Sequence, residues 1–338
     1  MSHLAAMPHM TFAEAIVVGL IQGSTELFPV SSLGHNVLIP ALIGGSWAKD
    51  LNVAKPESPY LAFIVGLHVA TAIGITAYFW RDWVRIVRGF FTSFQPNLTR
   101  PLKITTVEQR LAWMIILATI PVGLVGLAFE HKFRVLFGVP SRAAIFLVAN
   151  GVILFLGERF RPRKSREADD VVLQERELAS VGADRMAGAH ASGQRAARQQ
   201  EVADAVQADR RLTAFGYLQA IIIGSAQILA LLAGISRDGV TMVAGMCRGL
   251  SRQDAARFAF LLATPVILAA GVLKVPDLFG PQGKGILPQI LVGSVVSGVA
   301  AYLSVRFLMR YFQTRTLTPF AIYCVVFGLA SYIYLAVK

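Results

Sequence analysis

The sequence predicts an all-α polytopic membrane protein built as an inverted repeat, in which each half has one re-entrant broken-helix hairpin and three transmembrane helices. Three observations support this fold class. First, 55% of the 338 residues are hydrophobic and only 15% are charged, and the mean hydropathy is +0.57. Second, two long apolar segments are each interrupted by polar residues and glycine. Third, basic residues gather in alternate loops. Together these features exclude an ordinary soluble globular domain.

The two interrupted segments resemble each other. Residues 15–36 read AIVVGLIQGSTELFPVSSLGHN, and residues 220–241 read AIIIGSAQILALLAGISRDGVT. At one constant offset, the matched pairs are Ala15 with Ala220, Gly19 with Gly224, Gln22 with Gln227 and Ser31 with Ser236. Shared apolar residues alone would favour chance similarity, but matched glycine, glutamine and serine favour one broken helix that occurs twice. Such pairs point to an internal repeat whose site lies near the middle of the membrane.

The expected elements follow in order. A first repeat, residues 1–159, contains a re-entrant hairpin at about 12–45 and spans at about 61–80, 111–129 and 143–157. A second repeat, residues 213–338, contains a hairpin at about 215–247 and spans at about 257–273, 287–304 and 318–336. If both hairpins crossed the membrane instead of turning back, the chain would have eight crossings rather than six.

The positions of basic residues favour re-entrant hairpins. The loops after the first and third spans and before the last span are rich in arginine, and with six spans all three lie on the cytoplasmic side. If the second hairpin crossed the membrane, the loop that carries Arg248, Arg252 and Arg257 would lie outside. Irregular backbone inside a membrane is tolerated where it is buried in protein or lines a cavity, which suits a site. The net charge of +12 therefore marks a cytoplasmic face, and no nucleic-acid partner is expected.

Residues 160–212 differ in composition from the rest of the chain. They are rich in arginine, alanine, glutamine and acidic residues and have almost no aromatic residues. We expect a polar cytoplasmic insert that is disordered or loosely helical. The N-terminal residues lack a basic region and a cleavage motif, so no removable signal peptide is expected. Cys247 and Cys324 lie in or beside apolar sequence and predict neither a disulfide nor a metal site.

Glu26 is the strongest candidate in the first interrupted segment. An ionisable group inside a bilayer costs roughly 2.5–3.5 kcal/mol on insertion scales, and it usually marks a site. Its carboxylate can hold a divalent cation or act as a base, and the structural alternative is an acid paired with an arginine for packing. Gln22 lies one helical turn earlier, on the same face, and can bind an oxyanion or a metal ion.

Two serines and a histidine follow Glu26 closely. Ser31 and Ser32 lie between Pro29 and the pair Gly34–His35. A hydroxyl three residues from an imidazole on a constrained turn suits a nucleophile with its base, or a phosphate-binding pair. Helix capping is the structural alternative for either serine, and a lone histidine is more often structural. Beside Glu26 and the serines, His35 is interpreted as functional.

The second interrupted segment carries Arg237 between Ser236 and Asp238, with Thr241 one turn later. A guanidinium in a broken membrane helix requires an anion, and its fork geometry suits phosphate oxygens. The backbone N–H groups of a helix that begins near Ser236 can bind the same anion. The alternative is an internal salt bridge, for which Glu26 is a better partner than the adjacent Asp238. The two segments together predict a site for a phosphate group on a molecule that resides in lipid.

Residues 19–35, GLIQGSTELFPVSSLGH, and residues 233–241, AGISRDGVT, resemble the two signatures of the bacterial undecaprenyl pyrophosphate phosphatases, the bacitracin-resistance protein family. The resemblance covers nearly the whole chain except 160–212. It implies an inner-membrane enzyme that removes the terminal phosphate of C55 isoprenyl pyrophosphate, recycles the lipid carrier for cell-wall peptidoglycan and confers bacitracin resistance. It also implies an active site that opens to the periplasm and a need for a divalent cation, Mg²⁺ or Ca²⁺.

The resemblance also assigns residues. The active-site positions of the family fall on Gln22, Glu26, Ser32, His35, Ser236, Arg237 and Thr241. Catalysis is expected of Glu26, Ser32, His35 and Arg237. Binding of the pyrophosphate is expected of Gln22, Ser31, Ser236, Arg237 and Thr241. The nucleophile stays open between Ser32, His35 and water.

Three positions depart from the family pattern. Gln22 stands at a position where the pattern allows either glutamate or glutamine, Ala233 replaces a proline, and Asp238 replaces a serine. One carboxylate is thus gained while another is lost across the same expected cavity. We therefore expect Asp238 to help Glu26 hold the cation.

Other functions fit the same pattern. A transporter or flippase of a phosphorylated isoprenoid lipid, using the same midplane site, is the alternative, because inverted repeats with broken helices are a transporter architecture. A scaffold role through residues 160–212 is a third, weaker interpretation. The expected partners are a polyprenyl pyrophosphate substrate and membrane lipids, and a homodimer is compatible with the sequence.

Overall fold

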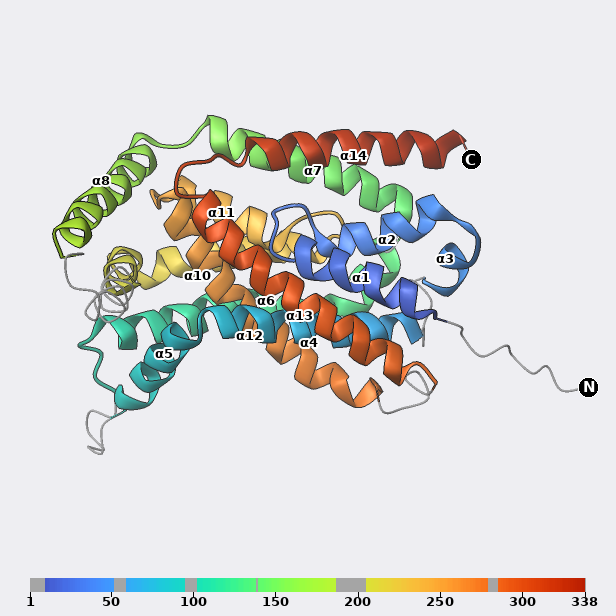
Figure 1. Ribbon diagram of the computed structural model, residues 1–338, viewed down its shortest axis with the longest axis horizontal. Coiled ribbons are helices and arrows are strands. Elements are labelled where there is room, and N and C mark those ends of the chain that lie inside the picture. The colour runs from blue at the N-terminus through green and yellow to red at the C-terminus, as the bar shows by residue number, and fades with distance from the viewer. Residues whose placement is uncertain are drawn as a thin grey trace, which may run out of the picture.

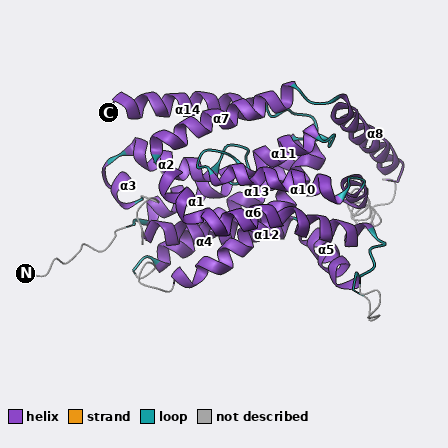
Figure 2. Cartoon of the chain, turned by 180° about the vertical axis from the view of Figure 1, so that it is seen from behind, coloured by secondary structure: helices purple, strands orange, loops and turns teal. Residues whose placement is uncertain are grey.

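The computed structural model describes residues 10–51, 59–94, 102–137, 139–186, 205–278 and 285–337. The described residues form helices and loops, with one isolated bridge between Phe94 and Leu102 and no strand. The predicted all-α membrane architecture is confirmed (Figures 1 and 2). The N-terminal segment 1–9, for which no removable signal peptide is expected, lies outside the described residues.

The helices follow the predicted order. The first half of the chain contains α1 (Phe12–Thr25), α2 (Ser32–Ile43), α3 (Gly45–Asp50), α4 (Pro59–Tyr78), α5 (Trp80–Thr92), α6 (Val107–Phe137) and α7 (Pro140–Arg159). The second half contains α10 (Tyr217–Ser225), the 3₁₀-helix η1 (Ala226–Leu231), α11 (Arg237–Cys247), α12 (Arg252–Leu278), α13 (Leu287–Tyr311) and α14 (Thr318–Val337). The exact limits of the two repeats stay a prediction.

Each predicted span corresponds to one helix. Five helices, α6, α7, α12, α13 and α14, are long and apolar enough to cross a membrane. Helix α4 covers the first predicted span and then bends by 88° into α5. One face of α5 is buried through Asp82, Ile86 and Gly89, whereas Val84 and Phe91 are exposed. This amphipathic pattern is typical of a helix that lies along a membrane surface.

Small residues allow α13 to pack closely against α1 and α4. A Cβ atom added at Gly19 of α1 would lie 2.6 Å from the carbonyl oxygen of Gly293. The hydroxyl groups of Thr71 in α4 and Ser297 in α13 are hydrogen-bonded at 2.9 Å. Membrane helices associate through such close backbone approach and interhelical hydrogen bonds, because lipid supplies no hydrophobic force between them. Helices from the two halves of the chain are therefore interlocked.

The two broken segments form hairpins whose loops meet inside the bundle. Helix α1 of the first hairpin begins with a capping box. The Thr11 hydroxyl accepts a hydrogen bond from the Glu14 N–H at 3.2 Å, and the Glu14 carboxylate accepts one from the Thr11 N–H at 2.8 Å. Helices α1 and α2 extend from one end of the bundle, and α10 and α11 extend from the other, so that both loops lie near the middle (Figure 1).

One end of the bundle, which we call the basic end, holds α5, α8 (Arg163–Met186) and the connection between α13 and α14 (Figure 1). Within the predicted insert, the described residues form α8 and a helix at Ala205–Thr213. The segment 187–204 lies outside the described residues. Arg211 donates hydrogen bonds to Asp254 of α12 at 2.8 Å and to Glu175 of α8 at 2.5 Å. Composition predicts the polarity of this segment but not its anchoring by ion pairs.

Candidate active site

Each hairpin loop ends at a serine that caps the next helix. Ser31 accepts a hydrogen bond from the Gly34 N–H at 3.2 Å, and Ser236 accepts one from the Gly239 N–H at 3.1 Å. These serines are the pair that the sequence repeat matches. Ser31 has a φ of 68°, a conformation that is rare for residues other than glycine and that occurs preferentially at functional sites. The positive ends of α2 and α11 therefore start at equivalent places in the two hairpins.

The two hairpin loops are in direct contact. A Cβ atom added to Gly34 would lie 3.0 Å from the Cα atom of Gly234. A Cβ atom added to Gly239 would lie 3.2 Å from the Cβ atom of Pro29. Gly234 also has a φ of +114°, which a residue with a side chain rarely adopts. Glycine is thus required where the two chain segments approach most closely.

Asn150, in the middle of α7, joins the two loops by hydrogen bonds. Its side-chain amide nitrogen donates to the carbonyl oxygen of Pro29 at 2.9 Å, and its side-chain oxygen accepts from the Ser236 N–H at 2.9 Å. Asn150 is fully buried. Buried polar groups are costly when unsatisfied, so this side chain fixes the loops relative to each other.

Glu26 lies at the centre of the candidate site. Its carboxylate accepts hydrogen bonds from the Gln22 amide at 2.8 Å, from the Ser32 hydroxyl and from the Arg237 guanidinium. Glu26 is 8% exposed. A buried carboxylate is tolerated only when it is paired and hydrogen-bonded, and here the pairing joins the two halves of the chain. The structure therefore brings together four of the residues that the sequence singles out.

Asp238 and Arg237 retain unsatisfied polar atoms. Asp238 is 1% exposed, and both of its carboxylate oxygens lack a hydrogen-bond partner among the described residues. Its nearest charged group is Arg237, whose Nε lies 3.8 Å from Oδ1 and also lacks a hydrogen-bond partner. Unsatisfied buried polar atoms require an explanation, and a role in binding a ligand or an ion is one such explanation.

Both ring nitrogens of His35 are bonded to groups other than the Ser32 hydroxyl. Its Nδ1 lies 2.7 Å from the carbonyl oxygen of Ser31, and its Nε2 lies 2.8 Å from the hydroxyl of Tyr323. Because a carbonyl only accepts, Nδ1 carries a proton, and in the neutral ring Nε2 accepts from Tyr323. The imidazole also stacks on Phe327 with a centroid separation of 5.2 Å. The sequence suggests His35 as a base for serine, but the structure pairs Ser32 with Glu26.

The remaining predicted residues support the loops. Thr241 donates its hydroxyl proton to the carbonyl oxygen of Arg237 at 2.7 Å. Gln22 accepts a hydrogen bond from the Asn36 amide at 2.5 Å while it donates to Glu26. Thr241 and Ser236 are predicted to bind the pyrophosphate, but their hydroxyl groups already make hydrogen bonds to the backbone of α11.

Three residues that contact the site were not recognised in the sequence. Besides Asn150 and Tyr323, His68 of α4 lies with its Nε2 3.4 Å from the Glu26 carboxylate. Its Nδ1 is bonded to the Ile64 carbonyl at 2.8 Å, so the contact with Glu26 is attractive when the ring carries both protons. The available signal was a histidine inside an otherwise apolar span, a type of residue that usually marks function.

Glu26 and Asp238, which the sequence predicts as metal ligands, offer only part of a ligand set. Among the described residues, no three His, Cys, Asp or Glu side chains are grouped to hold a metal ion. The two carboxylates both lie beside Arg237, and the Asp238 oxygens are free of hydrogen bonds. Mg²⁺ is commonly bound by one or two carboxylates together with substrate phosphates and water. Glu26 and Asp238 therefore fit a divalent cation that takes some of its ligands from the protein and the others from a bound phosphate.

The chain is similar to known proteins over nearly its whole length. Residues 15–330 match the family described as bacitracin resistance protein BacA. The chain is 55% identical to a protein of Mycolicibacterium paratuberculosis named undecaprenyl-diphosphatase, over 98% of this chain and 99% of the relative. It is 52% identical to undecaprenyl-diphosphatase 2 of Frankia alni, over 95% and 97%. It is 38% identical to undecaprenyl-diphosphatase 2 of Burkholderia lata, over 93% of each chain.

Proposed function

The chain belongs to the bacitracin resistance protein BacA family, and from this membership and the site we infer that it is an undecaprenyl-diphosphatase. It hydrolyses undecaprenyl pyrophosphate to undecaprenyl phosphate and inorganic phosphate. This reaction returns the lipid carrier to cell-wall synthesis and confers resistance to bacitracin. The single observation that carries the proposal is the contact of Glu26 with both Ser32 and Arg237, where the two hairpins meet.

The positive groups of the site bind the pyrophosphate. Arg237 presents a forked guanidinium, which pairs well with phosphate oxygens, and its Nε is free to donate. The N-terminal ends of α2 and α11 follow directly after the two loops and favour negative charge. On substrate binding, Arg237 exchanges part of its contact with Glu26 for the pyrophosphate. As the bridging oxygen leaves, the Arg237 guanidinium stabilises the negative charge that develops on that oxygen.

Ser32 and Glu26 supply the nucleophile and the base. The Ser32 hydroxyl already donates to Glu26, which is the arrangement needed to remove its proton. The Ser32 oxygen forms a bond to the terminal phosphorus, the bond to the bridging oxygen breaks, and undecaprenyl phosphate leaves. Water then displaces the serine oxygen, which releases inorganic phosphate, and the proton held by Glu26 returns to Ser32. His35, held by Tyr323 and Ser31, orients the loop that carries Ser32.

A divalent cation, Mg²⁺ or Ca²⁺, belongs to this proposal. Glu26 and Asp238 would hold it, and it would supply positive charge to the phosphate oxygens. Asp238 then replaces the charge that Gln22 lacks. If Asp238→Ser left the dependence of activity on divalent ions unchanged, and also left the affinity for Mn²⁺ measured by electron paramagnetic resonance unchanged, Asp238 would not be a ligand.

The charge distribution supports a proposed localisation and orientation. The protein is a multi-pass membrane protein, and we place it in the bacterial inner membrane with the basic end in the cytoplasm. The first hairpin extends from the opposite end of the bundle, which supports an active site open to the periplasm (Figure 1). Labelling of an introduced cysteine near α3 by a membrane-impermeant maleimide in intact cells tests this orientation.

Product analysis in ¹⁸O-labelled water tests the reaction. We expect one ¹⁸O atom in the released phosphate and none in undecaprenyl phosphate, because attack occurs at the terminal phosphorus. Acid quenching of the wild type is expected to trap phosphoserine at Ser32, and Ser32→Ala is expected to abolish it. Label in the lipid product would contradict terminal attack, and label in phosphate without phosphoserine would transfer the role of nucleophile to water.

A further inference from the structure

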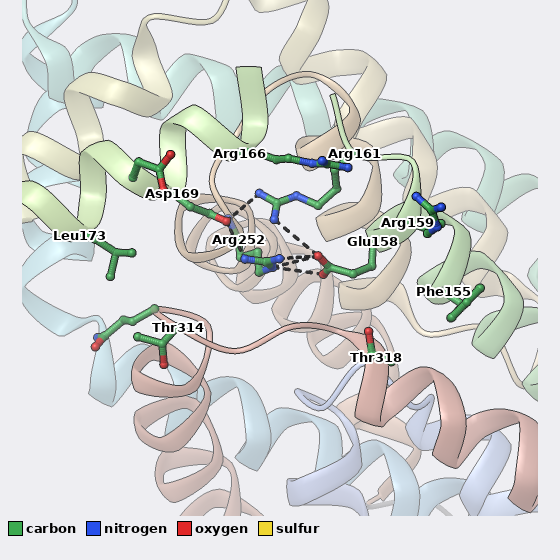
Figure 3. A pocket seen from close by; sticks show the side chains of 12 residues that line it. Phe155, Glu158, Arg159, Arg161, Arg166, Asp169, Leu173, Arg252, Thr314 and Thr318 are labelled. Carbon is green, nitrogen blue, oxygen red and sulfur yellow. Dashed lines mark hydrogen bonds and ion pairs between the residues drawn. The ribbon is translucent and has the colours of Figure 1, made fainter. Parts of the chain in front are cut away.

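A second polar site lies at the basic end, away from Glu26. An open pocket of about 470 Å³ is lined by the end of α7, the first turns of α8, the start of α12 and the connection between α13 and α14 (Figure 3). None of the residues in the proposed reaction lines it. The cavity therefore requires an explanation of its own.

The inner wall of this pocket is neutral and held in place. Arg161 pairs with Asp169 at 2.9 Å, and Arg252 pairs with Glu158 at 2.5 Å and with Asp169 at 2.6 Å. Arg161 is 5% exposed and also donates to the hydroxyl of Ser165 at 2.9 Å. These interlocked ion pairs hold the start of α8 against α7 and α12. The wall is thus formed before any ligand binds.

The outer part of the pocket carries excess positive charge. Arg159 and Arg166 line it, are exposed and have no side-chain hydrogen bond or ion pair among the described residues. Figure 3 shows dashed lines from Arg161 and Arg252 but none from these two guanidinium groups. Asp170 is the one lining acid without a described partner. Two unpaired cations against one anion favour a ligand of negative charge.

The pocket also borders the lipid-facing surface. Phe155 and Leu173 line it and are 49% and 40% exposed. Phe155 belongs to α7, which is apolar enough to span a membrane, and Arg159 is the last residue of that helix. The charged Arg159 therefore lies just beyond the apolar Phe155 along α7. The same order of apolar and charged groups occurs in a membrane, where acyl chains end at the headgroups. Basic pockets between membrane helices on the cytoplasmic side are typical sites for anionic headgroups.

We propose that this pocket binds the phosphate of an anionic phospholipid at the cytoplasmic surface of the membrane. Arg159 and Arg166 bind the phosphate oxygens, and Phe155 contacts the first part of the acyl chains. The bound lipid would join α8 to the membrane and to α7. This pocket is separate from Glu26, so lipid binding there does not depend on the phosphatase reaction.

Lipid binding by the full-length protein in an uncharged detergent tests the proposal. Labelled phosphatidylglycerol is the probe, phosphatidylcholine is the lipid without net charge, and inorganic phosphate is the soluble competitor. Arg159→Gln combined with Arg166→Gln is expected to weaken phosphatidylglycerol binding by roughly twenty-five-fold, since each basic residue near an anionic surface contributes about fivefold. Asp170→Asn is expected to tighten binding, and a change in that direction does not arise from a folding defect.

Arg88→Gln combined with Arg248→Gln is the matched control, because these arginines are exposed at the same end of the bundle but do not line the pocket. The control is expected to stay within about twofold of the wild type, because neither of its positions touches the ligand. Equal losses in both double variants, or no loss in the pocket variant, would overturn the proposal. Displacement of the lipid by millimolar phosphate would overturn its lipid part and assign the pocket to a soluble anion.

Discussion

Arg237 donates a hydrogen bond to Glu26 although the two residues are 211 positions apart and belong to different hairpins. The side chains are 16% and 5% exposed. This contact closes the site across the two halves of the chain, and it neutralises both charges inside the bundle. The same carboxylate also contacts Ser32, so one residue links charge pairing to the proposed nucleophile.

Separating the charge pair should destabilise the protein more than removing it. Glu26→Gln or Arg237→Gln alone is expected to lower the free energy of unfolding by about 3–5 kcal/mol, because each leaves a buried charge without its partner. The double replacement should cost less than the sum of the two single costs. Unfolding in detergent, followed by circular dichroism, measures this cycle. Strict additivity of the two costs would contradict a direct buried pair.

Asn150 should control the orientation of the two loops. Asn150→Asp keeps the acceptor for the Ser236 N–H but loses the donor to Pro29, and Asn150→Leu loses both. We expect kcat to fall in the order wild type, Asp, Leu, with about 1–3 kcal/mol of stability lost for each group left unsatisfied. Steady-state kinetics and thermal unfolding provide the two measurements. An Asn150→Leu protein with unchanged kcat would show that the bridge has no part in catalysis.

The close contact of the hairpin loops should not tolerate a methyl group. Gly34→Ala places a Cβ atom 3.0 Å from the Cα atom of Gly234, where backbone cannot easily move aside. We expect a loss of activity of at least about tenfold, since small displacements of reacting groups have large effects on rate. Gly126→Ala in α6 is the matched control. No atom lies within 4 Å of its added Cβ, and alanine should stabilise that helix by about 0.5–1 kcal/mol. Equal activity of the two variants would refute the contact.

The end of the polar insert should contribute to stability. Asp209 is 1% exposed and pairs with Arg257 at 2.7 Å and with Arg85 at 3.0 Å. Asp209→Ala is expected to cost about 3–5 kcal/mol because it leaves buried cations with less compensation. Glu167→Ala breaks the exposed pair with Arg163 and should cost less than about 1 kcal/mol. The measurement is the free energy of unfolding of each variant. Similar costs for the two variants would show that Asp209 does not anchor the helix Ala205–Thr213.

Much of the fold was accessible from the sequence because the bilayer restricts the choice of structures. Apolar length identifies the helices. The contact of Glu26 with Arg237 corresponds to the structural alternative that the sequence offers for Arg237 beside phosphate binding, because a buried cation needs an anion. Other features depend on how helices rotate and pack. The Asn150 bridge, the contact of His68 with Glu26 and the hold of Tyr323 on His35 each join residues that are distant in the chain. A single sequence carries no signal for such pairs.

The nature of the insert was predictable only in part. Its polarity is evident from composition, and its placement at the basic end fits the excess of arginine. The buried positions of Arg161 and Asp209 were not evident, because an isolated charge on a polar helix is usually solvated. Arg161 finds acidic partners on α7 and α8, and Asp209 finds basic partners on α5 and α12, so both charges are buried as ion pairs. Charge clusters in such segments therefore need a structure before they are assigned to solvent.

The most direct test of the central claim is the release of phosphate from C55 isoprenyl pyrophosphate by the purified protein, with and without Mg²⁺ or Ca²⁺. We predict metal-dependent release that is lost in Glu26→Ala and in Arg237→Ala, each compared with the wild type for retained folding. No release by well-folded wild-type protein would contradict the proposed phosphatase activity. The same residues would then be interpreted as the binding site of a transported lipid. Release that persists in both variants would place the reaction elsewhere in the molecule.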